Sequence, residues 1–237
     1  MITDRMSLDE VKEQLFFDIH TFEKSNDYRE CLKKYRRYLI RNMNKTSVKF
    51  RTKSFTSDKF QNTYYMITNA YINKKTKSYS LDITYYTFRY LERGGMIAYQ
   101  LCLGDTLISD IEEYMFVFPQ HFWERYRERY LEEDIHGFDL IHKFFENNCI
   151  ERIRNNEERG ENEVIGIVND GLCLGIKENV EINVFKTFIS NKEMHDNQIL
   201  SFEKGLNSIE KEKEFLTTSK FTAGTVKILF SELRKFY

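Results

Sequence analysis

The chain has 237 residues, which is enough for one large domain or two small ones with a buried core. Its composition, with 41% hydrophobic, 15% aromatic and 31% charged residues, excludes a disordered chain and is typical of a globular protein. The net charge of −1 argues against a protein that holds duplex nucleic acid by overall charge alone, because such proteins usually carry a basic excess. A local basic groove remains compatible with this figure.

Cysteine spacing and the N-terminal residues bear on the cellular setting. No two cysteines have CxxC spacing, so neither a zinc site nor a disulfide framework is indicated. We therefore expect reduced thiols in a cytoplasmic protein that uses no metal and no cofactor. The N-terminal residues lack the apolar segment of a signal peptide, and apolar runs such as residues 114–118 are too short to span a membrane.

The first segment, residues 1–46, is predicted to be helical. Ser7 and Glu10 have the spacing of a capping box, and apolar residues from Leu15 to Phe22 recur at helical intervals. After a break near residues 25–27, a second helix carries a set of basic residues, namely Lys33, Lys34, Arg36, Arg37 and Arg41. Two interpretations stay open for these cations: a solvated helix surface, which is the commoner case, or a phosphate-binding face.

The second segment, residues 47–118, is rich in β-branched and aromatic residues and predicts strands. Because the connections are too short for crossover helices, we expect a mainly antiparallel sheet. Alternation over residues 79–86 predicts one buried face, which includes Leu81 and Ile83, and one wet face. The many tyrosines either pack this sheet or offer a surface for bases or a partner, and packing is the simpler interpretation.

The third segment, residues 119–237, is predicted to combine helices with an antiparallel sheet. Pro119 suits the first turn of a helix that runs to about residue 134, and residues 137–156 predict another helix. Strands follow over residues 163–190, with a hairpin turn at Asn169 to Gly171, and residues 191–206 and 222–237 predict helices. The fold class is therefore α+β, and the three segments are compatible with one compact domain.

One helix face in the third segment is the first candidate for chemistry. His121, Arg125, Glu128, Arg129 and Glu132 share one side of the predicted helix. The carboxylates could neutralise the arginines, which would make this face a set of surface ion pairs of little energetic value. A phosphate-sized anion between the arginines is the functional alternative.

The remaining histidines have weaker signals. His136 stands beside Gly137 and is expected to cap the last carbonyls of a helix. His142 is expected on a helix surface. His195 closely follows the strand that ends near residue 190, so it could approach His121 and supply a second acid–base group.

The order of these elements resembles the small ribonuclease toxins of the RelE, BrnT and colicin D kind, grouped as the barnase–EndoU–colicin–RelE fold. The resemblance covers roughly residues 115–200 and rests on a helix with the pattern H-x-x-x-R-x-x-x-R before a late strand. His121, Arg125 and Arg129 match the helix of that pattern. The late strand residues correspond to Lys186, Thr187 and Ser190.

This resemblance implies cleavage of RNA without a metal ion. The 2′-hydroxyl attacks the adjacent phosphorus, which requires a base, an acid and cations for the added negative charge. Histidine can serve as base or acid near neutral pH, and arginine binds a pair of phosphate oxygens. The resemblance thus gives catalytic roles to His121, Arg125, Arg129, Thr187 and His195, and substrate binding to Lys186 and Ser190.

Two functions follow as expectations. The first is an endoribonuclease-like protein of the toxin or defence type, with RNA as substrate and an antitoxin-like protein as a possible partner. The second is a non-enzymatic binding or structural protein that uses the aromatic-rich sheet as a partner surface. The first requires His121, Arg125, Lys186 and Thr187 to line one concavity. The same periodicities predict that Leu81, Ile83, Phe122 and Tyr126 are buried.

Overall fold

The computed structural model describes residues 2–41, 47–51, 54–73, 78–103, 113–131, 133–148, 150, 152–155, 160 and 162–218. The helices are α1 (Leu8–Glu23), α2 (Asn26–Arg41), α3 (Gln120–Tyr126), the π-helix η1 (Arg127–Leu131), α4 (Gly137–Asn147) and α5 (Asp196–Thr218). The strands are β1 (Ser47–Arg51), β2 (Phe55–Thr56), β3 (Thr63–Asn73), β4 (Ser78–Tyr90), β5 (Met96–Leu103), β6 (Glu113–Phe118), β7 (Arg152–Asn155), β8 (Glu163–Val168), β9 (Gly171–Lys177) and β10 (Ile182–Ser190). The predicted α+β class is confirmed.

Within the described residues, ten strands form one sheet in the order β1-β3-β4-β5-β6-β10-β9-β8-β7, with β2 beside β3. The predicted antiparallel pairing holds except between β6 and β10, which run parallel with Ile182 opposite Met115. This pair joins strands from before and after Pro119 into a continuous hydrogen-bonded sheet. The division into the segments 1–46, 47–118 and 119–237 stays a prediction.

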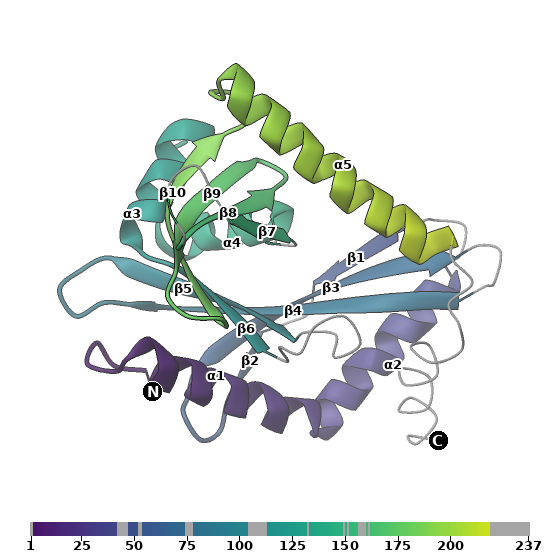
Figure 1. Ribbon diagram of the computed structural model, residues 1–237. Coiled ribbons are helices and arrows are strands. Elements are labelled where there is room, and N and C mark those ends of the chain that lie inside the picture. The colour runs from purple at the N-terminus through teal and green to yellow at the C-terminus, as the bar shows by residue number, and fades with distance from the viewer. Residues whose placement is uncertain are drawn as a thin grey trace.

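Helices cover both faces of the central strands, as Figure 1 shows. Tyr85 on β4 packs in a cluster with α1 and α2, whereas its neighbour Tyr86 packs in a second cluster with α3 and α4. Both rings are almost completely buried. The predicted wet face, which contained Tyr86 and Thr84, is therefore wrong at this strand. Alternation of apolar and polar residues does not distinguish a solvent-exposed face from a face whose tyrosine rings pack against helices.

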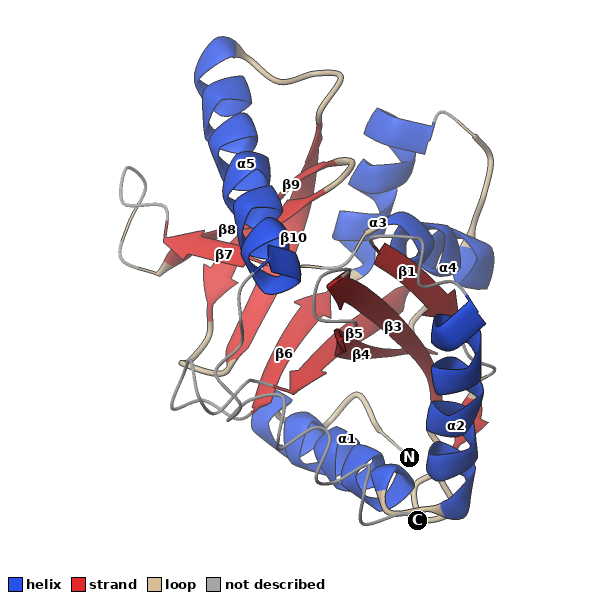
Figure 2. Cartoon of the chain, turned by 90° about the vertical axis from the view of Figure 1, so that its right-hand side faces the viewer, coloured by secondary structure: helices blue, strands red, loops and turns tan. Residues whose placement is uncertain are grey.

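The sheet curves around α3 and α4. Strands β7–β10 turn away from the plane of β1–β5, so the two halves of the sheet face these helices from two sides (Figures 1 and 2). Phe118 of β6, Phe185 and Phe188 of β10, and Trp123 of α3 belong to the same buried cluster. Their rings meet at centroid distances such as 5.7 Å for Phe118 and Phe185, which is within the usual range for aromatic pairs.

Several local predictions hold. Ser7 and Glu10 form the predicted capping box, and Phe122 and Tyr126 are fully buried as predicted. Ile83 is only partly buried against the α1–α2 side, and the side chain of Leu81 lies outside the described part of the structure.

The predicted helix over residues 137–156 is wrong beyond Asn147. Asn148 adopts extended angles, with φ −123° and ψ 135°, and its side chain is held by Asp170. Ile150 then donates its N–H to Gln100, and residues 152–155 pair with β8 as a strand. The predicted helix over residues 222–237 lies outside the described residues.

Helix α5 lies so close to β8 that a side chain at one of its positions would require Ile167 to shift. A Cβ atom at Gly205 would overlap Cδ1 of Ile167 and lie 3.2 Å from its Cγ1. In an open helix, glycine to alanine stabilises by about 1 kcal/mol. Here we expect Gly205→Ala to lower the free energy of unfolding by about 1 kcal/mol instead, because overpacking costs about 1–3 kcal/mol.

Chemical denaturation of the wild type, Gly205→Ala, Ile167→Val and the double variant tests this expectation. Valine lacks Cδ1, so Gly205→Ala should become neutral or stabilising in the Ile167→Val background. Equal effects of Gly205→Ala in both backgrounds would show that α5 does not pack on β8 in this way.

Candidate functional site

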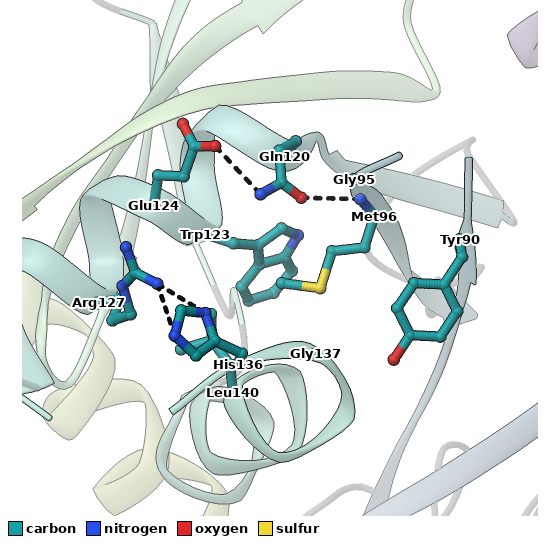
Figure 3. Close-up of a pocket in the computed structure, with 10 residues that line it drawn as sticks. All are labelled: Tyr90, Gly95, Met96, Gln120, Trp123, Glu124, Arg127, His136, Gly137 and Leu140. Carbon is teal, nitrogen blue, oxygen red and sulfur yellow. Dashed lines mark hydrogen bonds between the residues drawn. The ribbon is translucent and has the colours of Figure 1, made fainter. Parts of the chain in front are cut away.

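A pocket of about 210 Å³ opens between the β4–β5 turn, α3 and the start of α4. Figure 3 shows Arg127 and His136 on one side, Tyr90 on the other, and Trp123 and Met96 between them. The remaining lining residues are Gly95, Gln120, Glu124, Gly137 and Leu140. The pocket thus joins an arginine, a histidine, a carboxylate and a phenol around an apolar floor.

His136 is held at the pocket by two charged neighbours. Nη1 of Arg127 lies 2.6 Å from Nδ1 and 3.1 Å from Nε2 of His136, and Nε2 lies 2.6 Å from Oδ1 of Asp134. These partners fit the neutral tautomer in which Nδ1 accepts from the arginine and Nε2–H donates to the carboxylate. The imidazole is still 60% exposed, so a ligand in the pocket can reach it.

His136 lies at the start of helix α4, not at the end of a helix. His136 is the N-cap residue of α4, with extended angles of φ −134° and ψ 168°, and its side chain makes no capping hydrogen bond. The expectation that His136 caps the last carbonyls of a helix is therefore wrong. Gly137 follows with φ +58°, and a Cβ there would lie 2.9 Å from the hydroxyl oxygen of Tyr90. Glycine is thus needed both for the backbone conformation and for the approach of Tyr90.

Gln120 and Glu124 form the opposite rim, on the first turns of α3. Oε1 of Gln120 accepts the N–H of Met96 at 2.7 Å, which fixes the β4–β5 turn to the helix. Nε2 of Gln120 donates to Oε1 of Glu124 at 3.1 Å. Gln120 therefore holds the carboxylate of Glu124 in place through Oε1. The second oxygen, Oε2, is available to a ligand or to His121, whose Nδ1 lies 3.5 Å away.

The arginines near the end of α3 point in different directions, and Arg127 shares the pocket side of the helix with Gln120, Trp123 and Glu124. α3 ends at Tyr126 and continues as the π-helix η1, which is wider than an α-helix and shifts the side chains that follow. Arg127 reaches His136, whereas Arg129 donates to the backbone oxygen of Phe188 at 2.7 Å. The predicted face that unites His121, Arg125 and Arg129 is therefore wrong, because Arg129 turns toward β10.

His121 and Arg125 stay on the outer side of α3. Nη1 of Arg125 lies 3.0 Å from Oε2 of Glu128, as expected for a helix laced by ion pairs. His121 is 56% exposed and faces Glu124. Neither residue lines the described pocket.

The late strand residues do not join them. Thr187 pairs with Leu174, which packs on the α5 side of the sheet, whereas Phe185 and Phe188 occupy the side that α3 covers. The expectation that Thr187 lines a concavity with His121 is therefore wrong. The irregular register between Phe185 and Thr187 leaves Lys186 exposed at a β-bulge.

Ser190 and His195 have structural partners near the end of β10. Ser190 is fully buried, and its Oγ accepts the N–H of Lys192 at 3.2 Å. His195 is exposed and precedes α5, where its N–H donates to Oε1 of Gln198 at 3.0 Å and its carbonyl accepts the N–H of Ile199 at 2.9 Å. Both therefore shape the turn between β10 and α5.

A buried polar network fixes the base of the α3–α4 layer. Oδ2 of Asp170, in the β8–β9 turn, accepts the hydroxyl of Tyr126 at 2.8 Å and Nδ2 of Asn148 at 2.6 Å. Burial, and then the charge of Asp170, raises the pKa of Tyr126 well above its ordinary value. Burial together with Asp170 also raises the pKa of Tyr130 to about 12. The network therefore links α3 and the C-terminal end of α4 to the β8–β9 turn of the sheet through the carboxylate of Asp170.

Glu124, Arg127, His136 and Tyr90 were not predicted as site residues. Local signals were available for three of them: the glycine after His136 permits the turn that exposes the imidazole, and Glu124 and Arg127 share a helix face with Gln120 and Trp123 at the spacing i, i+3, i+4 and i+7. Tyr90 depends on the pairing of β4 with β5, which the spacing does not show.

Broader comparisons complete the description of the site. Among the described residues, no three His, Cys, Asp or Glu side chains are grouped in a way that could hold a metal ion. No helix in the described part of the chain has both the length and the apolar character needed to cross a membrane. No protein-family model matches the chain, and neither a curated protein nor a solved structure is significantly similar to it.

Proposed function

We propose that the protein cleaves RNA without a metal ion and that the reaction takes place in the pocket of Arg127 and His136. The observation that carries this proposal is the grouping of His136, Arg127 and Glu124 around one pocket. A proton donor, a phosphate-binding fork and a carboxylate base are the parts that the reaction needs. The resemblance to ribonuclease toxins suggested the reaction, although the pocket uses other residues than the pattern did.

The chemistry assigns one role to each group. Glu124 accepts the proton of the 2′-hydroxyl as its oxygen attacks phosphorus. Arg127 leaves the imidazole and binds the non-bridging phosphate oxygens through its planar fork. His136 takes up a proton at Nδ1 once Arg127 has left it, and gives this proton to the departing 5′-oxygen as the P–O5′ bond breaks. The products are a 2′,3′-cyclic phosphate and a 5′-hydroxyl.

The pocket walls suit a nucleotide next to the reacting phosphate. Tyr90 is 62% exposed, so its ring can stack on a base, as aromatic side chains do in proteins that bind single strands. Trp123 and Met96 give an apolar floor for the same base. A cytoplasmic location and an antitoxin-like protein partner belong to this proposal as further expectations.

The alternative function, a partner surface on the aromatic sheet, has less support. Tyr64, Tyr85, Tyr86 and Tyr99 are almost completely buried, so these rings pack the interior. Within the described strands, they leave no broad aromatic face for a protein partner.

A matched pair of arginines tests the proposal. We expect Arg127→Gln to slow RNA cleavage by roughly 10²-fold, the usual effect of removing one donor to a developing anion. Arg125→Gln should cleave nearly as fast as the wild type, because Arg125 faces Glu128 on the outer side of the helix. The assay compares labelled RNA and DNA of one sequence in the presence of EDTA.

Three outcomes would contradict the proposal. Cleavage of the DNA would exclude attack by a 2′-hydroxyl, and loss of activity only in Arg125→Gln would move the site to the outer face of α3. Equal cleavage by the wild type and both variants would indicate a contaminating nuclease. Thermal melting of the three proteins controls for folding.

A further inference from the structure

Helix α2 presents a basic stripe that the pocket does not use. Lys34, Arg37, Tyr38 and Arg41 follow the spacing i, i+3, i+4 and i+7, so they lie along one side of the helix. All four are exposed. The stripe is therefore continuous over about two helical turns.

The charge on this helix is strongly unbalanced. α2 contains six basic and two acidic residues, and Glu30 is occupied by Lys33, whose Nζ lies 2.8 Å from Oε1. The pKa of Glu30 is lowered, first by the hydrogen bond from Lys33 and then by its charge, with smaller effects from Arg37 and Lys34. The other acidic residue, Asp27, lies in the first turn of the helix, away from Arg37 and Arg41. Within α2, little negative charge thus compensates the stripe.

The apolar side of α2 is already covered. Tyr35 is buried in the cluster that α1 and the sheet share, Cys31 and Leu32 pack against that cluster, and Leu39 is also buried. A helix that lies in a membrane surface needs an exposed apolar side, which α2 lacks among its described side chains. Tyr38, which is 45% exposed, is an aromatic ring among the cations. Cations interleaved with an exposed ring are typical of surfaces that bind single-stranded nucleic acid.

We infer that the stripe of Lys34, Arg37, Tyr38 and Arg41 binds the backbone of single-stranded RNA, with Tyr38 stacking on a base. The choice of RNA over DNA rests on the proposed function, whereas the binding itself does not require the pocket. α2 packs on one face of the sheet and α3 on the other, so the two sites are separate surfaces (Figure 2). The stripe would hold the RNA strand at a distance from the residues that cleave it.

Fluorescence anisotropy with a labelled 2′-O-methyl oligouridine tests the inference on the full chain. This probe has no free 2′-hydroxyl, so binding is measured without cleavage. We expect the triple variant Lys34→Gln, Arg37→Gln, Arg41→Gln to raise Kd by roughly ten- to hundredfold at low salt. The slope of log Kd against log salt should fall by about 2, because each lost phosphate contact removes about 0.7 from the slope for a single strand.

Two further proteins control for net charge and for folding. A triple variant of exposed lysines elsewhere, Lys59→Gln, Lys204→Gln and Lys211→Gln, makes the same change in charge and should bind as the wild type does. The variant Lys34→Arg, Arg37→Lys, Arg41→Lys keeps the charge and should restore most of the binding. Tyr38→Ala should weaken binding and leave the salt slope unchanged.

Several results would overturn the inference. Equal losses in the two glutamine triples would reduce the effect to overall charge. Binding to vesicles of anionic lipid, with no binding to the oligouridine, would assign the stripe to a membrane surface. The proposed function is judged separately, because Arg127→Gln and Arg125→Gln are compared by cleavage of unmodified RNA, whereas the 2′-O-methyl probe reports binding and cannot be cleaved.

Discussion

Replacing Asp170 by alanine is expected to lower the free energy of unfolding by about 3 kcal/mol. Asp170 is buried, and its carboxylate accepts hydrogen bonds from Tyr126 and Asn148. Without it, a buried hydroxyl and a buried amide lose their acceptor, and each unsatisfied group costs about 1–3 kcal/mol. Urea denaturation followed by tryptophan fluorescence suits the measurement, because Trp123 lies in the same core cluster as Tyr126.

Asp58→Ala is the matched control, since Asp58 is exposed in a turn and should change stability by less than about 0.5 kcal/mol. Tyr126→Phe removes one donor and keeps the ring, so it should cost only about 1 kcal/mol. If Asp170→Ala were no more harmful than Asp58→Ala, the network would not hold the helices to the sheet.

Local signals in the sequence predicted most of the elements. The capping box at Ser7 and Glu10 depends on contacts between residues close in sequence, and it forms as predicted. The hairpin turn at Asn169 to Gly171 is equally local, and β8 pairs with β9 across it. Such features are predictable because their energy comes from neighbours along the chain.

Features that depend on the tertiary structure were not predictable in this way. Tyr86 looks like a residue of a wet face until α4 covers it, and His142 of that helix then approaches the Tyr86 hydroxyl to 2.5 Å. Residues 152–155 follow a helical pattern but become a strand because β8 offers an edge. Propensity is a weak guide wherever such long-range pairing competes with it.

The candidate site shows the same limit. His121, Arg125 and Arg129 were grouped on an ideal helix, and the π-helix at Arg127 separates Arg129 from that group. A π-helical turn lies at the end of α3, and such turns are frequent at functional sites. Arg127, the first residue of this turn, lies on the pocket side of the helix and meets His136 at the start of α4. The π-helical turn and the contact with His136 leave no pattern in the sequence.

His136→Ala is expected to slow RNA cleavage by ~10²–10⁴-fold, the usual contribution of a positioned acid–base group. His121→Ala is the matched control and should leave the rate nearly unchanged. Both imidazoles are more than half exposed and each faces one carboxylate, and His136 also makes an exposed contact with Arg127. Thermal melting should therefore show only small shifts for both, because exposed residues rarely contribute more than ~0.5 kcal/mol.

The comparison of the two histidine variants distinguishes catalysis in the pocket from catalysis on the helix face that the sequence predicted. Of the two histidines, His136 alone lines the pocket with Arg127, and its ring contacts both the arginine and the carboxylate of Asp134. Asp134→Asn should accordingly reduce the rate less than His136→Ala does, since asparagine can still accept from the imidazole but does not stabilise its charge. A fall in rate with His121→Ala alone would place catalysis on the outer face of α3. Loss of activity with both variants would show that His121, which faces Glu124, also contributes to the reaction, and would contradict the restriction of catalysis to the pocket residues.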